Sequence, residues 1–252
     1  RESQMIYTSD REAARDAIAP FTELVKSPEY VHTYRISHLS LWNAAATGRT
    51  AEEVLDSLHL HSRFPVPQNV IREITSYMGR YGTLQLVREG DELHLVAKDP
   101  LALAEARHVK AAMPWMLDLL APDRCLVDGR FRGHIKLALT LAGLPVEDLA
   151  GYTVGDPLSF TTRDVTVSGK PFHLRDYQRE AGEIFHAAGS VKGGCGTVVL
   201  PCGAGKTVVA IGAMALAQCH TLILTTNVVA VRQWIREILD KTDLTEDLVT
   251  TY

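Results

Sequence analysis

Apolar residues recur every three or four positions through the first 81 residues, and this spacing predicts short helices. The helices are predicted to begin at Asp10, at Ser37 or three residues later, and at Thr50. Thr50 and Glu53 have the Thr-x-x-Glu spacing of a capping box, in which each side chain accepts a hydrogen bond from the other residue's backbone amide. This part of the chain is therefore expected to be a helical module.

The period changes to two from residue 84 onward. Leu84, Leu86, Leu93 and Leu95 alternate with other residues around a polar turn, which predicts a β-hairpin. Helices followed by a hairpin are typical of winged-helix folds, many of which bind nucleic acid. The alternative is that the helices simply pack a small core of their own. The remaining elements predicted in this region are a helix at 100–113, a strand at 125–127 and a helix at 134–142.

The pattern changes again in the last third of the chain. Residues 155–171 lose periodicity and are rich in Gly, Pro, Ser and Thr, so we predict a linker there. Beyond it, helix and strand alternate, which implies a parallel, doubly wound α/β sheet. The elements predicted here are helices at 176–188, 205–218 and 229–239 and buried strands at 197–200 and 221–225.

Composition narrows the classes of protein without naming one. The chain has 252 residues, and 46% of them are hydrophobic, which suffices for real cores. A net charge of −4 means that any binding to nucleic acid must come from a local basic surface. No run approaches about 18 apolar residues, so a membrane span is not expected. The four cysteines have no metal-like spacing, which favours free thiols and an intracellular location, in the cytoplasm or nucleoid.

Between the strand predicted at 197–200 and the helix that follows lies a glycine-rich loop. Gly203 and Gly205 allow the backbone to turn so that several amides face one anion. Lys206 would contact the β- and γ-phosphates of ATP, and the Thr207 hydroxyl would ligate Mg²⁺. Leu200 stands where the strict phosphate-loop pattern has Gly. The whole loop runs Pro201-Cys202-Gly203-Ala204-Gly205-Lys206-Thr207.

Two more segments carry candidate chemistry near this loop. Gln178 lies in the first turn of the preceding helix, where its amide has both a donor and an acceptor for the adenine edge. Thr226 and Asn227 follow the strand predicted at 221–225, where short polar groups are able to hold a nucleic-acid phosphate. A plain helix cap is the alternative for both residues.

Several of these segments together resemble the XPB-type DNA repair helicases of superfamily two. The resemblance covers nearly the whole chain and is strongest after Phe172. It is carried by Leu174-Arg175-Asp176-Tyr177-Gln178, by Leu200 and the glycine-rich loop, by Gln233-Trp234 and the residues at 240–247, and more loosely by Ser40-Leu41-Trp42 and residues 81–87.

The resemblance implies an ATPase that moves along DNA in the 3′–5′ direction. It implies that Arg175 and Gln178 form the adenine motif, that residues 200–207 bind the phosphates of ATP with Lys206 and Thr207 as the catalytic pair, and that Thr226, Asn227 and Gln233 contact the DNA backbone. Val228 departs from the family pattern, which often has Arg there. The implied cofactors are ATP and Mg²⁺, and the implied partner is double-stranded or forked DNA, with a nuclease as a further possible partner.

The implied architecture is a truncated RecA-like motor domain preceded by small α+β modules. We predict a helical accessory domain at 1–81, a damage-recognition-like domain at 82–154, the linker at 155–171 and the first part of the motor domain at 172–252. This sequence contains no acidic box to hold Mg²⁺ and orient water, so we expect it to bind nucleotide without turning ATP over. A restriction-type translocase and a non-catalytic binding module remain alternatives.

A local basic cluster lies within the second of these modules. Arg130, Arg132 and Lys136 surround Phe131, which suits contacts to phosphates and the stacking of a base. The alternative is a solvated surface, because Asp128 lies close by in the sequence.

Overall fold

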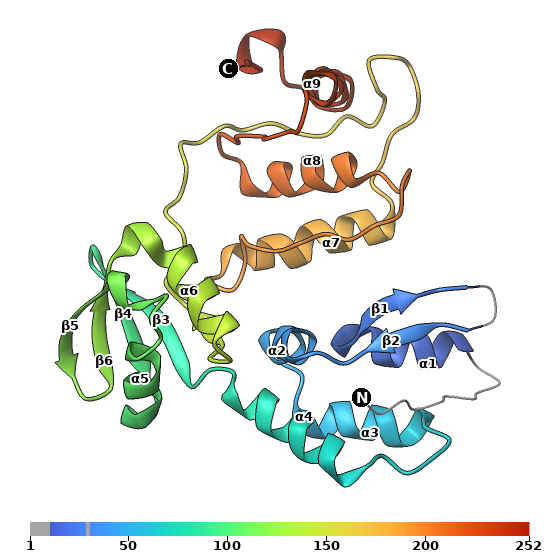
Figure 1. Ribbon diagram of the computed structural model, residues 1–252. Helices are drawn as coiled ribbons and strands as arrows, with labels where there is room; N and C mark the ends of the chain where they lie inside the picture. The colour runs from blue at the N-terminus through green and yellow to red at the C-terminus, as the bar shows by residue number, and fades with distance from the viewer. Residues whose placement is uncertain (1–10, 29–30, 252) are drawn as a thin grey trace. The chain divides into compact units, whose positions relative to one another are not determined.

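The computed structural model describes residues 11–28 and 31–251, which form two compact units, 1–150 and 151–252. The chain is mixed α/β, as predicted (Figure 1). Among the described residues, no helix has the length and apolar content needed to cross a bilayer. The helix predicted to begin at Asp10 is described from Arg11, and Asp10 itself lies outside the described residues.

The first unit begins with a helical part. Ser37 caps α2 and Thr50 caps α3, each with a complete capping box, so the predicted starts of both helices are confirmed. Apolar residues from α2, α3 and α4 converge on a core that contains Phe21, Leu41 and Ile74. The elements here are α1 (Arg11–Ile18), η1 (Ala19–Phe21), β1 (Glu23–Lys26), β2 (Thr33–Arg35), α2 (His38–Ala46), α3 (Ala51–His61) and α4 (Gln68–Arg80).

A five-stranded sheet follows, with the order β5-β6-β4-β3-β7. The predicted hairpin is confirmed as the antiparallel pair β3 and β4, and β7 runs parallel to β3. The side chains of Leu84, Leu86, Leu93 and Leu95 lie in a core that is separate from that of the helices. The hairpin therefore does not pack as a wing on those helices, and the interpretation of a separate small helical core holds. The elements are β3 (Leu84–Glu89), β4 (Glu92–Ala97), α5 (Pro100–Arg107), η2 (Met113–Trp115), β5 (Met116–Ala121), β6 (Arg124–Val127), η3 (Gly129–Phe131), α6 (Arg132–Leu141) and β7 (Val146–Asp148).

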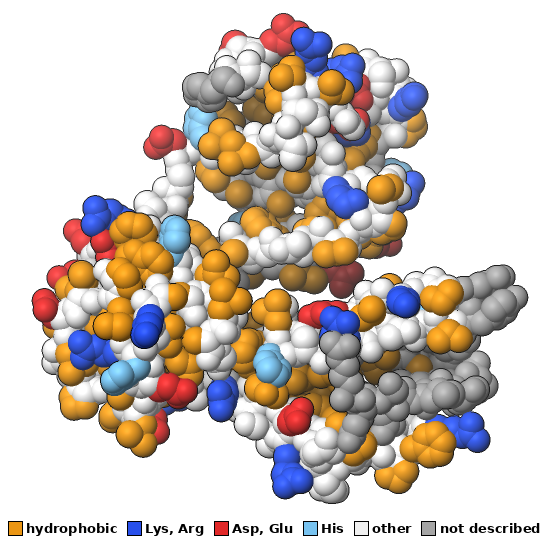
Figure 2. Space-filling view, in the orientation of Figure 1, with side chains coloured by type: hydrophobic (Ala, Val, Ile, Leu, Met, Phe, Trp, Pro, Cys, Tyr) orange, Lys and Arg blue, Asp and Glu red, His pale blue; other side chains and the backbone are white. Residues whose placement is uncertain are grey.

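The edge strand β5 was not predicted. Its sequence does not alternate, and Leu117, Leu119 and Leu120 are all about half exposed. Figure 2 shows apolar side chains at the surface of this part of the chain. Strand β7 has only three residues, too few for a period to emerge.

The second unit contains three long helices. Helix α7 lies beside α8, where Gly182 allows close approach to the backbone at Gly212 and Ala213 (Figure 1). A small core gathers around Phe160 and Ile211. The elements are α7 (Asp176–His186), η4 (Ala187–Gly189), α8 (Lys206–Ala217), α9 (Val228–Lys241) and η5 (Glu246–Leu248).

Residues 155–171 are packed within this unit. Isolated bridges pair Pro157 with Cys219 and Thr162 with Thr242, and Phe160 is buried. The loss of periodicity at 155–171 reflects irregular backbone held by such contacts, so this stretch differs from the free linker that its composition suggested.

The strands predicted at 197–200 and 221–225 are not formed in the structure. A strand needs a hydrogen-bonded neighbour, and neither segment has one within the described residues. Several of their apolar side chains face solvent instead: Val199 is 86% exposed and Leu224 is 84% exposed, although Ile223 packs against the core around Phe160.

Candidate nucleotide-binding site

The glycine-rich loop joins the unpaired segment at 197–200 to the first turn of α8. Both Gly203 and Gly205 have a positive φ, of 82° and 81°, in the left-handed region that glycine adopts without steric strain. Gly205 is also the residue that caps α8. The loop therefore turns sharply and ends at the positive end of a helix dipole.

Most backbone amides of this loop are unpaired. Within the described part of the chain, one loop amide has a protein acceptor, that of Ala204, which donates to Pro201. The other five have none, namely those of Cys202, Gly203, Gly205, Lys206 and Thr207. Unpaired amides gathered at the start of a helix are the arrangement that binds phosphate.

The two polar side chains of the loop remain available to a ligand. The Lys206 ammonium donates to the Pro201 carbonyl over 3.2 Å, so it lies folded over its own loop, and it is exposed. Thr207, one residue further, is partly exposed.

The first turn of α7 contacts the loop directly. Gln178 is buried, and its Oε1 accepts from the Arg175 amide while its Nε2 donates to the Ala204 carbonyl at 3.0 Å. The Tyr177 hydroxyl donates to the same carbonyl at 2.7 Å. The first turn of α7 and the glycine-rich loop, 25 residues apart from Gln178 to Gly203, are thus joined directly by hydrogen bonds.

A hollow of about 270 Å³ opens where these segments meet. The side chains of Arg175 and Gln178 line it, but both ends of the Gln178 amide already bond within the protein, so its predicted contact with the adenine edge stays a prediction. It is also lined by Phe172 and His173, which the sequence did not single out as site residues, and by Gly203, Ala204, Gly205 and Val208.

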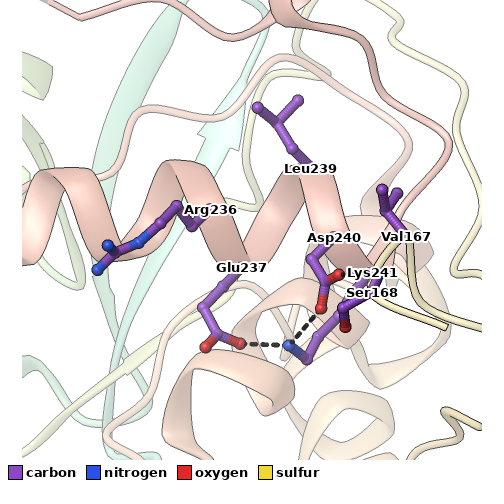
Figure 3. A pocket seen from close by; sticks show the side chains of 7 residues that line it. All are labelled: Val167, Ser168, Arg236, Glu237, Leu239, Asp240 and Lys241. Carbon is purple, nitrogen blue, oxygen red and sulfur yellow. Dashed lines mark hydrogen bonds and ion pairs between the residues drawn. The ribbon is translucent and has the colours of Figure 1, made fainter. Parts of the chain in front are cut away.

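Another hollow, of about 420 Å³, lies at the C-terminal half of α9 (Figure 3). Three of its charged groups pair with one another: the Lys241 ammonium is 2.6 Å from Glu237 and 3.5 Å from Asp240. The backbone amide of Ser168 donates to Asp240, which lowers the pKa of that carboxyl group. Although it is larger, this hollow lacks the unpaired amides of the loop, and we assign it no chemistry.

The predicted DNA-backbone residues lie at the start of α9. Asn227 caps this helix by accepting from the Ala230 amide, and its side-chain nitrogen donates to the Thr226 hydroxyl. Gln233 lies on the exposed surface of the same helix. Asn227 therefore acts as a helix cap in the structure, and both Thr226 and Asn227 remain exposed at the surface.

The basic cluster of the first unit is largely neutralised. Arg132 makes two hydrogen bonds to Asp148, at 2.8 and 2.7 Å, and Lys136 lies 3.0 Å from the same carboxylate. Burial raises the pKa of the Asp148 carboxyl group, but the hydrogen bonds from Arg132 and Lys136 outweigh it and leave the pKa lowered.

Arg130 differs from its neighbours because its side chain is 83% exposed, although it pairs with Asp128. Phe131 stacks on Trp115 with ring centroids 5.4 Å apart, so one of its faces is already covered. Of the three basic residues predicted to contact DNA, Arg130 is the one that remains at the surface.

The described residues contain no group of three or more His, Cys, Asp or Glu side chains that suits a metal ion. Thr207, the one predicted Mg²⁺ ligand, lies in the first turn of α8, and its role in holding the ion stays a prediction. A phosphate-bound Mg²⁺ keeps several waters and takes few protein ligands, so a single hydroxyl is compatible with it.

A glycine-rich loop whose unpaired amides lie at the start of a helix is the feature shared by phosphate-loop nucleotide-binding proteins. Comparison with known families agrees: a profile described as the type III restriction enzyme res subunit matches residues 171–248. A second profile, described as a helicase conserved C-terminal domain, matches residues 4–121.

Individual relatives carry the comparison further. The chain is 47% identical to the DNA 3′-5′ helicase XPB of Mycobacterium tuberculosis, over 93% of this chain and 41% of that protein. It is 46% identical to the protein of the same name from Kineococcus radiotolerans, over 95% of this chain and 42% of that protein. The general transcription and DNA repair factor IIH helicase/translocase subunit XPB of Enterocytozoon bieneusi is 26% identical over 93% of the chain.

These matches confirm the resemblance: the chain is an XPB-type superfamily-two sequence along at least 93% of its length. It spans about two-fifths of the length of the two more similar relatives.

Proposed function

We propose that this chain is the nucleotide-binding portion of an ATP-dependent DNA helicase or translocase that acts in DNA repair with 3′–5′ polarity. The observation that carries the proposal is the loop at 201–207, whose unpaired amides lie at the start of α8 and beside the first turn of α7. The names of the relatives, which are similar to this chain over 93% and 95% of its length, support DNA as the substrate.

In this proposal ATP lies with its phosphates on the loop amides and its base in the hollow lined by Phe172, His173 and Arg175. Lys206 leaves the Pro201 carbonyl and pairs with the β- and γ-phosphates. Mg²⁺, held by Thr207 and the phosphate oxygens, would neutralise charge that develops on the transferred phosphoryl group.

The 252-residue chain alone is proposed to bind nucleotide without hydrolysing it. None of the residues lining the hollow carries a carboxylate, so the hollow offers no acidic group to hold Mg²⁺ and orient an attacking water.

We place the DNA contacts on the exposed polar residues of the second unit, Thr226, Asn227 and Gln233, and on Arg130 of the first unit. Arg130, Arg132 and Lys136 all pair with carboxylates, but Arg132 and Lys136 are weaker candidates because their side chains are only 16% and 32% exposed.

The proposal is tested by titrating ATP with Mg²⁺ into the chain and into its Lys206→Ala variant. Loss of the ammonium is expected to weaken binding by at least about tenfold, because one charged hydrogen bond is worth about 1.5–3 kcal/mol. The variant should keep the thermal midpoint of the parent, since the side chain is exposed.

Lys192→Ala is the matched control, because Lys192 is an exposed lysine in another loop of the same unit. Equal ATP affinity of the Lys206 variant and the parent would contradict the proposed site.

Two other functions share some of the evidence. A restriction-type translocase is favoured by the family profile at 171–248, but that match covers only the second unit and leaves the similarity over the first unit unexplained. A non-catalytic DNA-binding module would place the affinity in the first unit. A salt titration of DNA binding by residues 1–154 and by the whole chain separates these ideas, since the slope counts phosphate contacts.

A further inference from the structure

The phenol of Tyr177 is the structural link between α7 and the phosphate loop. Its hydroxyl donates to the Ala204 carbonyl at 2.7 Å, and it accepts weaker contacts from the Gln178 amide at 3.4 Å and from the Arg175 guanidinium at 3.5 Å. The ring is 37% exposed and does not belong to the apolar core of the unit. The hydroxyl is thus at the centre of a small polar network, while the ring contributes little to packing.

The hydrogen bond has a directional consequence for the loop. A peptide unit is planar and trans, so its C=O and the following N–H point in opposite directions. When Tyr177 and Gln178 hold the Ala204 carbonyl toward α7, the Gly205 amide must point away from α7. That amide is one of the five loop amides with no acceptor among the described residues.

Gln178 is a poor candidate for an independent role in this link. It is 5% exposed, and both ends of its amide are occupied, one by the Arg175 amide in the capping box of α7 and one by the Ala204 carbonyl. Removing it would disturb the start of α7 as well as the loop. Among the described residues, the Ala204 carbonyl is the one backbone group to which the Tyr177 hydroxyl is hydrogen-bonded.

We propose that Tyr177 is a positioning residue for phosphate binding: its hydroxyl fixes the Ala204–Gly205 peptide so that the Gly205 amide is presented to the anion. This inference rests on the proposed function, because it takes the loop to be the triphosphate site. It assigns Tyr177 no contact with the base.

The experiment compares Tyr177→Phe with the parent chain by calorimetric titration with three probes, namely ATP, inorganic tripolyphosphate and adenosine. Loss of one neutral hydrogen bond that pre-orders a binding group is expected to weaken ATP and tripolyphosphate alike, by about three- to tenfold. Adenosine binding and the thermal midpoint without ligand are expected to change little. Tyr34→Phe, which removes a hydroxyl in the first unit, is the matched control and should leave all three affinities unchanged.

A second readout follows the loop itself. In amide NMR spectra without ligand, Tyr177→Phe should shift the signals of residues 203–207 and leave those of α9 in place. Shifts confined to α7 would contradict the inference, since the hydroxyl would then not control the loop.

The outcomes separate the inference from the function on which it rests. If the parent binds ATP and Tyr177→Phe binds it equally well, the positioning role is wrong and the proposed site stands. If only adenosine binding weakens, Tyr177 contacts the base and the inference is again wrong. If the parent binds neither ATP nor tripolyphosphate, the proposed function fails and takes the inference with it.

Discussion

Two glycines of the phosphate loop have nearly the same backbone conformation but different neighbours. An added Cβ at Gly205 would lie 2.6 Å from the Gln178 side-chain nitrogen, which is too close for two unbonded atoms. An added Cβ at Gly203 would meet nothing within 4 Å. The pair therefore separates the cost of a left-handed backbone from the cost of displacing Gln178.

Gly203→Ala is expected to lower the free energy of unfolding by about 1–2 kcal/mol through backbone strain alone. Gly205→Ala should cost more than Gly203→Ala and should also weaken ATP binding more, because Gln178 must leave the Ala204 carbonyl. Urea unfolding and ATP titration of both variants measure this. Equal losses in the two variants would show that the contact with Gln178 is unimportant.

At this scale the sequence was informative about the loop and less so about its surroundings. Gly203, Gly205 and Lys206 lie within four consecutive positions, so the local pattern was enough to predict their proposed roles in phosphate binding. Tyr177 was visible only as part of a short motif, because a tyrosine's partner 27 residues away, Ala204, is set by how α7 packs on the loop. Arg132 was predicted to contact DNA because it lies in a local basic cluster. Its partner Asp148 is 16 residues further along the chain, so the local pattern did not reveal the ion pair.

At the scale of elements, the ion pairs of Asp148 tie β7 to α6. The Asp148 side chain is 11% exposed, as against 16% for Arg132 and 32% for Lys136, so water screens the cluster only in part. This cluster helps to hold β7 at the edge of the sheet. The strand has only three residues, so few backbone hydrogen bonds attach it to β3.

The lowered pKa of Asp148 makes its contribution depend on pH. The contribution is fully present above the unfolded-state value, about 3.9, and is lost as pH falls through the lower folded-state value. Asp148→Asn is expected to lower the free energy of unfolding by about 2 kcal/mol at pH 7, because it leaves Arg132 without its counterion. Below pH 4 the difference in the free energy of unfolding between the parent and Asp148→Asn should become steadily smaller.

Urea unfolding of parent and variant at pH 7, 5, 4 and 3 tests this. Asp118→Asn, at an exposed position on β5, is the matched control and should show no such narrowing. If the difference in the free energy of unfolding between the parent and Asp148→Asn stays constant down to pH 3, the ionised carboxylate does not contribute to stability.

Helices were predicted better than strands, for a physical reason. A helix satisfies its hydrogen bonds within one segment, so caps such as Ser37 and Thr50 mark its start locally. A strand depends on a partner that the local pattern does not reveal. Hence the hairpin of β3 and β4 was found, β5 and β7 were missed, and the strands predicted at 197–200 and 221–225 are unpaired.

At the scale of the whole molecule, the two hydrophobic cores that precede residue 151 draw on no residue beyond it. The third core draws only on residues after it. The domains at 1–81 and 82–154 remain our proposal, since each contains one of the first two cores. The sequence suggested a boundary through composition, but composition did not reveal that Phe160 is buried.

Residues 1–150 are accordingly expected to fold when expressed alone. Circular dichroism should show helical content and a single cooperative thermal transition, because both cores are complete within the fragment. A fragment that lacks a cooperative transition would show that the first unit depends on the second.

The unpaired segments at 197–200 and 221–225 have a consequence for how the chain behaves in solution. Their amides lack ladder partners, so deuterium should replace their protons long before those of β3 and β4. Their exposed Val199, Leu222 and Leu224 also offer apolar surface to other copies of the chain at high concentration. The protein should therefore aggregate less in dilute than in concentrated solution.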